Sequence, residues 1–127
     1  MLKISSCFSQ KIVLSVSGKS GYRCCNPDCR RHTVGPNADF TNTVDIGSVC
    51  FICAPSPEGP RFDRNMPRSK RFSEDNGILL CQECAIKVEL DESSYPADLV
   101  RRWKRQAIQM AYEELGLESD MCPPSPI

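Results

Sequence analysis

The longest amphipathic pattern in the chain covers residues 97–115. Its apolar positions, which recur at helical spacing, are Leu99, Trp103, Ala107, Met110 and Ala111. One face of a helix collects residues spaced in this way, and Gly116 follows as a residue typical of helix ends. The pattern predicts a helix over 97–115 and assigns Trp103 to the core, because it lies in register with its apolar neighbours.

A second, shorter helical pattern occupies residues 10–20. It follows Ser9, a residue type that caps helix N-termini, and Gly21 supplies a stop. The apolar side chains that share one face are Ile12, Val13 and Val16. A helix this short is marginal alone, so we expect it to pack against another element.

Three short apolar runs indicate strands. Residues 43–46 and 49–52 are separated by Gly47 and Ser48, a pattern consistent with either a kinked strand or a hairpin. Residues 78–80 predict a buried strand that leads into a helix over roughly 84–90. Together with the helices, these runs predict an α+β fold.

The remaining segments carry turn chemistry. Residues 22–32 predict a tight loop, 33–42 a polar and turn-rich segment, and 91–96 a break between helices. The proline density of residues 55–71 predicts a long surface loop. We expect a single domain over residues 1–116 with its core in 20–105, frayed ends at 1–8, and a flexible Pro-rich tail at 117–127.

Composition adds a constraint on chemistry. The 127 residues include 16 basic and 16 acidic side chains, so no overall positive field draws the chain to nucleic acid. The sequence shows no signal peptide and no membrane-spanning run, from which we expect a cytoplasmic protein without a membrane partner. Its nine cysteines are then better explained as metal ligands and free thiols than as disulfides.

Two cysteine pairs have the spacing of a structural zinc site. Cys24 and Cys29 stand at the two ends of the 22–32 loop, and Cys81 and Cys84 join the predicted strand to its helix. Four thiolates complete the tetrahedral coordination of zinc. The positive N-terminal end of the predicted helix also stabilises the thiolate form of Cys84. The spacing predicts a structural zinc ion that ties the two segments together.

Several alternatives compete with this ligand set. Cys25 is the neighbour of Cys24, and Cys50 with Cys53 forms another C-x-x-C pair, although on a strand the two sulfur atoms diverge. His32 is the one histidine and a further candidate ligand. All of these cysteines also fit the plainer interpretation of buried, free thiols.

Beyond the cysteines, a longer set of residues resembles the HNH endonucleases of the ββα-metal, or treble-clef, class with a four-cysteine zinc site. The resemblance covers residues 20–105. The residues that carry it are 20–24, Pro27, Cys29, Ile46, Gly47, 52–54, Ser56, Pro57, 59–61, Asn65, Met66, 76–81, Cys84 and 99–104. The resemblance implies a small zinc-stabilised treble-clef domain with flanking helices.

The same resemblance implies that catalysis is lost. Active relatives carry a general-base histidine where this chain has Phe51, and a metal-binding histidine where it has Ala85. The loop-orienting asparagine is retained as Asn76, and Cys50 stands at a position that can assist the metal. A phenyl ring accepts no proton and a methyl group binds no cation, so we expect no catalytic magnesium ion.

The favoured function is therefore a catalytically inactive, protein-binding or structural subunit, and the resemblance suggests a bacterial multi-component system such as anti-phage defence. One alternative is nucleic-acid binding without cleavage, through the basic side chains of Arg61, Arg64, Arg68, Lys70 and Arg71. For Arg61, the resemblance also implies a role in holding its own loop together. The 101–105 segment is also basic. Another alternative is a metal nuclease that uses Asp45, Cys50 or Glu83 in place of histidine.

Overall fold

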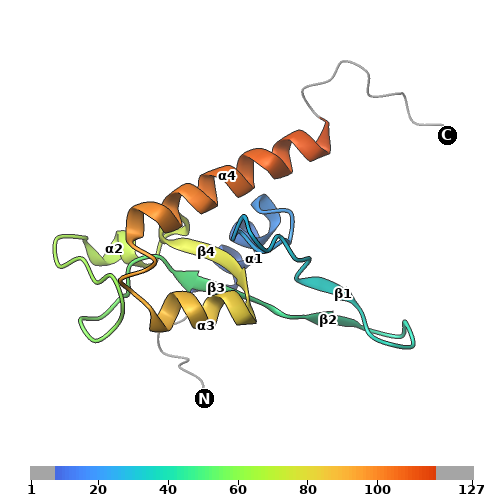
Figure 1. The fold of residues 1–127 in the computed structure, drawn as a ribbon, viewed down its shortest axis with the longest axis horizontal. Helices are drawn as coiled ribbons and strands as arrows, with labels where there is room; N and C mark the ends of the chain where they lie inside the picture. The colour runs from blue at the N-terminus through green and yellow to red at the C-terminus, as the bar shows by residue number, and fades with distance from the viewer. Residues whose placement is uncertain (1–7, 117–127) are drawn as a thin grey trace.

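The computed structural model describes residues 8–116 and contains both helices and strands. The elements are α1 (Gln10–Lys19), β1 (Val34–Pro36), β2 (Thr43–Asp45), β3 (Gly47–Phe51), α2 (Arg68–Arg71), the 3₁₀ turn η2 (Glu74–Asn76), β4 (Gly77–Cys81), α3 (Gln82–Leu90) and α4 (Ala97–Leu115). The strands form two antiparallel pairs, β1 with β2 and β3 with β4 (Figure 1). This arrangement confirms the α+β class.

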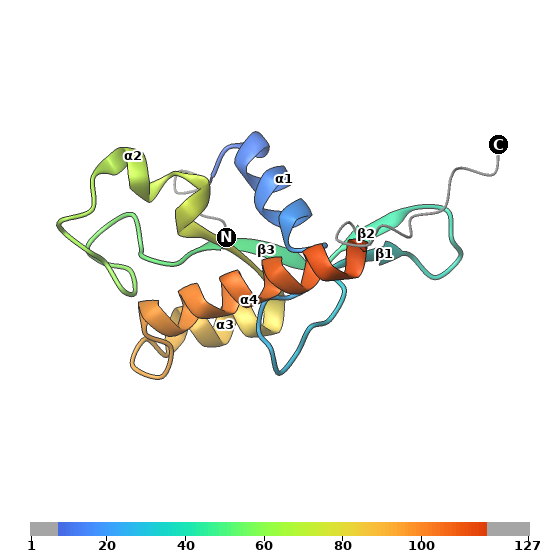
Figure 2. The same ribbon diagram turned by 90° about the horizontal axis from the view of Figure 1, so that it is seen from above.

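The β3–β4 hairpin forms the centre of the molecule. Every residue of β4 is buried, and Ile78 and Leu80 are fully enclosed, as expected for an apolar strand covered on both faces. Figure 2 shows α1 on one side of β3, with α3 and α4 on the other. The helices contribute Val16, Val88 and Val100 to the same core. The β1–β2 hairpin extends away from this body (Figure 1).

The sequence signals at the helix ends correspond to hydrogen bonds and backbone angles. Ser9 Oγ accepts a hydrogen bond from the Ile12 N–H at 3.3 Å, which caps α1. The helix α4 has its predicted bounds, and Gly116 ends it in the left-handed conformation with φ of +73°. Trp103 is buried and packs edge-on against Tyr95, with ring centroids 5.6 Å apart, so its assignment to the core is confirmed.

Residues 43–52, predicted as a kinked strand or a hairpin, form two consecutive strands that pair with different partners. β2 pairs with β1, whereas β3 pairs with β4, so the hairpin interpretation of 43–52 is wrong. At the junction, the Ile46 N–H donates to Thr33 O and its carbonyl accepts from the Gln82 N–H. A Cβ on Gly47 would lie 2.9 Å from the Thr33 Cβ, which explains glycine at this point.

Three further segments differ from expectation. The 33–42 segment is predicted to be polar and turn-rich, but its residues 34–36 form β1. They do so because they pair with β2, a contact that local composition does not reveal. Residues 68–71 form the short helix α2 inside the predicted loop, since Pro67 precedes it and no proline interrupts it. α3 begins at Gln82, two residues before the predicted start. The predictions for residues 1–7 and 117–127 lie outside the described residues.

No helix among residues 8–116 is long and apolar enough to cross a membrane.

Arg61 organises the long loop between β3 and β4. Its side chain is only 8% exposed; Nε donates to Ile52 O at 2.6 Å and Nη1 to Val88 O at 2.9 Å. Its backbone N–H donates to Glu92 Oε2 at 2.9 Å, and its φ of +59° marks a sharp bend. Burial lowers the pKa of Arg61, an effect that Glu89 and Glu92 oppose. One guanidinium thus joins the loop to β3 and to α3.

We expect Arg61→Lys to destabilise the protein by about 2 kcal/mol, because a lysine ammonium does not reproduce the fork that reaches both carbonyls. Urea unfolding of the metal-saturated protein measures this loss. The matched control is Arg64→Lys, since Arg64 is exposed in the same loop and has no such contacts. Equal stability of the two variants would contradict the role assigned to Arg61.

Candidate metal centre

The four cysteines that the sequence pairs are brought together in space. The Sγ atoms of Cys24, Cys29, Cys81 and Cys84 all lie within 4.8 Å of one another. The first two come from the loop after α1, Cys81 ends β4, and Cys84 lies in the first turn of α3. Two segments more than fifty positions apart in the chain therefore meet at one point.

The spacing of the sulfur atoms fits a tetrahedral metal ion. Zinc–sulfur bonds of about 2.3 Å give sulfur–sulfur edges of about 3.8 Å in a regular tetrahedron. The Sγ atoms of Cys29 and Cys81 are 3.8 Å apart. Three of the four cysteines are buried and Cys29 is half-buried. Four protein ligands complete a tetrahedron, so this set keeps no open position of the kind a catalytic metal uses. The donor set therefore suits a structural metal ion.

The loop that carries Cys24 and Cys29 is shaped by Asn26. Asn26 Oδ1 accepts a hydrogen bond from the Asp28 N–H at 3.0 Å, and Asn26 O accepts one from the Cys29 N–H at 2.9 Å. Its Nδ2 also donates to the Cys84 Sγ at 3.4 Å. Asn26 therefore bends the loop and supports a ligand at the same time. The sequence indicated only the turn, since the contact with Cys84 depends on the closed fold.

The thiols of the cluster are electrostatically unequal. Burial raises the pKa of Cys24 above its usual range and also raises the pKa of Cys84. Burial acts in the same direction on Cys81, but hydrogen bonds from Cys84, Cys29 and Cys24 outweigh it and lower the pKa of Cys81. A cluster of thiolates in a buried place needs a cation, and a divalent metal ion supplies that charge.

The competing cysteines and His32 lie elsewhere. The Cys25 Sγ donates to Ser20 Oγ at 3.4 Å, and the Cys50 Sγ lies 3.7 Å from Ser48 O. Cys53 accepts a hydrogen bond from an Arg101 Nη2 at 3.4 Å. His32 is exposed and belongs to a short bridge with residue 23. Among residues 8–116, the four-cysteine group is the one cluster with the geometry to share a metal ion.

The positions that the HNH resemblance assigns to catalysis line an apolar groove. Phe51 stacks on Phe8 with ring centroids 4.1 Å apart and meets Phe72 edge-on at 5.5 Å. Ala85 is buried on α3, and it lines the same groove of about 690 Å³ as Phe51. Neither side chain offers a proton acceptor or a metal ligand.

Asn76 clamps the end of β3 to the following loop. Its Oδ1 accepts from the Cys53 N–H at 2.9 Å, and its Nδ2 donates to Cys53 O at 2.8 Å and to Arg71 O at 2.9 Å. The Asn76 carbonyl accepts from the Ile52 N–H at 2.8 Å. All of its polar side-chain atoms are therefore engaged with backbone groups, which gives this asparagine a structural role in the described fold.

The three candidate substitutes for a catalytic ligand are dispersed. Asp45 Oδ1 accepts from the Gly47 N–H at 2.8 Å, and Glu83 forms an ion pair with Arg31 at 3.4 Å. Burial raises the pKa of Cys50 to about 12, which disfavours the thiolate that a metal needs. These side chains form no shared cluster within the described residues.

The predicted basic surface is smaller than the sequence indicates. Arg61 is buried and holds backbone carbonyls, so its inclusion in that surface is wrong. Arg71 is half-buried above the Phe62 ring, and the Arg68 guanidinium lies 4.9 Å from the centroid of the Phe72 ring. Arg64, Arg68 and Lys70 remain exposed.

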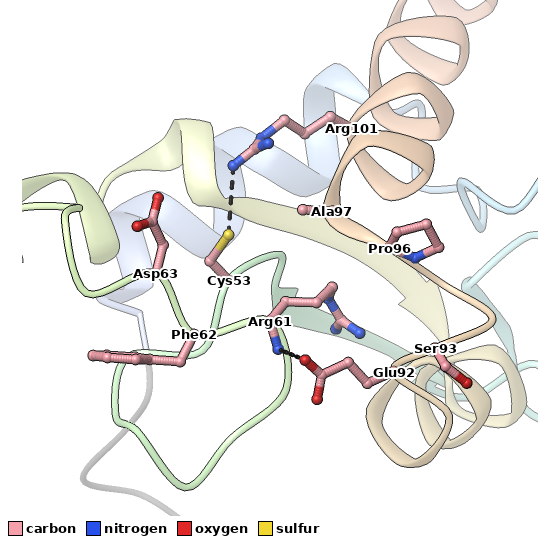
Figure 3. Close-up of a pocket in the computed structure, with 9 residues that line it drawn as sticks. All are labelled: Cys53, Arg61, Phe62, Asp63, Glu92, Ser93, Pro96, Ala97 and Arg101. Carbon is pink, nitrogen blue, oxygen red and sulfur yellow. Dashed lines mark hydrogen bonds between the residues drawn. The ribbon is translucent and has the colours of Figure 1, made fainter.

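A second pocket, of about 600 Å³, lies between the loop after β3 and the α3–α4 connection. Figure 3 shows the Cys53 thiol beside Arg101 at one end of it and Arg61 beside Glu92 at the other. Burial raises the pKa of Cys53, although Arg101 opposes this effect. The thiol is 3% exposed, so this pocket presents little nucleophilic surface.

No protein-family model matches the chain, and no curated protein matches it.

We expect one metal ion per chain, bound by the four-cysteine cluster. Cobalt substitution reports the site through thiolate-to-cobalt charge-transfer bands, and elemental analysis gives the stoichiometry. Cys84→Ser weakens binding because a hydroxyl replaces a thiolate, whereas Cys25→Ser, the control, retains one ion. Chelation lowers the free energy of unfolding by several kcal/mol or more. Less than one ion per gently purified wild-type chain would rule out the site.

Proposed function

We propose that this chain is a catalytically inactive, HNH-like zinc domain of treble-clef type that acts as a protein-interaction or structural subunit. The observation that carries the proposal is the groove around Phe51 and Ala85. The positions that the resemblance assigns to a base and a metal ligand have apolar side chains, and the groove remains open beside them.

The arrangement of β3, β4 and α3 supports the fold part of the proposal. A hairpin leads directly into a helix, and a four-thiolate cluster joins its end to an earlier loop. This order of elements is what the HNH resemblance implies, with zinc as the metal that suits four thiolates. The bacterial, cytoplasmic and anti-phage setting is part of the proposal and is supported by the resemblance alone.

The rim of the groove supports a binding role. Ile86 and Leu90 stand one helical turn apart on α3 and are 59% and 82% exposed. Both line the groove, so its apolar floor continues onto an exposed helix face. Apolar side chains gathered in this way mark protein contacts more often than isolated exposed ones do.

We expect the zinc-loaded protein to leave plasmid DNA intact in magnesium or manganese. Phosphodiester hydrolysis needs a general base and a metal ion at the cleavage site, and the two positions that the resemblance assigns to them, Phe51 and Ala85, supply neither. Agarose electrophoresis over a long incubation measures nicking and linearisation. Cleavage by the purified, zinc-loaded protein would contradict the proposal.

We expect Leu90→Asp to reduce capture of the partner protein in affinity purification from the native cells, by about tenfold or more. The exposed side chain contributes little to folding, so a loss of capture reports the surface. Leu115→Asp is the matched control, since Leu115 is 70% exposed on α4 and lies outside the groove. Equal capture by the wild type and both variants would remove the groove from the interaction.

A further inference from the structure

The outer edge of β3 carries backbone groups that β4 does not use. In the β3–β4 register, Ser48 opposes Leu80 and Cys50 opposes Ile78. Hydrogen bonds join Ile46 to Gln82 and Ile52 to Asn76 at the two ends of this register. Because hydrogen-bonded pairs alternate along an antiparallel ladder, the even-numbered residues of β3 face β4.

The odd-numbered residues of β3 therefore direct their N–H and C=O groups away from β4. The Gly47 N–H donates to Asp45 Oδ1, which satisfies one of these groups. Within residues 8–116, no other segment hydrogen-bonds the backbone of Val49 or Phe51. An edge with unpaired donors and acceptors at alternate residues is a template for another strand.

The groove runs along this same edge. Four consecutive residues of β3, 48–51, line it. Side chains alternate between the two faces of a strand, so consecutive residues share a groove only at the edge. Val13 of α1 lines one side and Ala85 of α3 the other. The groove is thus a slot beside the strand, with a helix above and a helix below.

The two walls differ in chemistry. Phe51 and Phe8 stack on the side of α1, which makes that wall apolar. On the side of α3 stands Glu89, whose charge acts on the buried Cys50 of β3. Glu89 and Glu58 are the charged side chains that line the groove within residues 8–116, and both are acidic. Successive side chains of an extended segment in the slot would face the apolar wall of Phe8 and Phe51 and, in alternation, the α3 wall, where Glu89 stands among apolar side chains.

We propose that the edge of β3 accepts an extended segment of a partner protein, whose alternate side chains are apolar and basic. The segment adds a strand to the β3–β4 hairpin by hydrogen-bonding Val49 and Phe51. Its apolar side chains face Phe8 and Phe51, and its basic side chains face Glu89. This inference rests on the proposed interaction function and names its mode and partner chemistry.

The test uses the full chain and a hexapeptide of alternating lysine and valine, acetylated and amidated at its ends. Binding to the ¹⁵N-labelled protein shifts the amide resonances of Val49 and Phe51 and slows their hydrogen exchange. Two N-methylated peptides, one at the lysine and one at the valine nitrogens, provide the decisive comparison. We expect one of these two peptides to lose affinity by about tenfold or more and the other to keep it, because only alternate N–H groups of the added strand face β3.

Substitutions in the protein supply the second arm. Glu58→Lys combined with Glu89→Lys weakens peptide binding about tenfold at low salt, whereas Glu113→Lys, on α4, leaves it unchanged. Val49→Pro removes an outward N–H without touching the ladder to β4 and abolishes binding. Circular dichroism and metal stoichiometry show whether each variant remains folded. If Val49→Pro does not fold, the N-methylated peptides still test the inference.

Equal binding of both N-methylated peptides would overturn strand pairing, and peptide binding that the double charge reversal leaves unchanged would overturn the basic chemistry of the partner. Nuclear Overhauser contacts from Leu2 or Ile4 to Phe51 in the free chain would show that its own N-terminal segment occupies the slot. A dimer that forms through β3 in sedimentation would identify a second copy as the occupant. Either result would contradict the proposal that a segment of a partner protein occupies the slot. Partner capture that depends on Leu90 without peptide binding would leave the proposed function intact and remove the strand-pairing mode.

Discussion

Four cysteines that meet at one point have the geometry to hold together, through a shared metal ion, segments that are otherwise connected only by short elements. A two-stranded hairpin is marginal in water, and β3–β4 has no third strand among the described residues. Joining Cys81 and Cys84 to the loop of Cys24 and Cys29 fixes the end of β4 and the start of α3. This closure places α3 across the hairpin, and the groove beside Phe51 exists because α3 lies there. A metal ion at the four cysteines would therefore also support the shape of the groove.

The cysteines lie at the end of β4, and two polar side chains hold the chain at the end of β3. Asn76 holds both backbone groups of Cys53, and Arg61 holds Ile52 O and Val88 O. Each is buried with most of its donors satisfied, the Nη2 of Arg61 excepted. These contacts hold the long loop against β3 and α3. The groove is therefore shaped by contacts within the folded chain.

The sequence specified those parts of the molecule that local pattern or ligand spacing controls. The bounds of α4, the Ser9 cap and the buried β4 strand follow from periodicity and capping, and the two cysteine pairs follow from spacing. What it missed depends on contacts across the fold. β1 forms because β2 pairs with it, and Arg61 leaves the basic surface because carbonyls from two distant segments meet its guanidinium. The open edge of β3 is likewise visible only once the ladder to β4 is known.

The phenyl ring of Phe51 affects both the stability of the fold and the chemistry of the groove. Its stacking against Phe8 and its edge contact with Phe72 each stabilise the fold by about 0.5–1.5 kcal/mol beyond the burial of area. A protonatable ring in the same apolar surroundings would need a hydrogen-bond partner that this wall does not offer. The aromatic cluster therefore stabilises the hairpin and places no proton acceptor on this wall. It also leaves the backbone edge of Phe51 and Val49 as the polar feature of the groove, and a strand is the ligand that matches it.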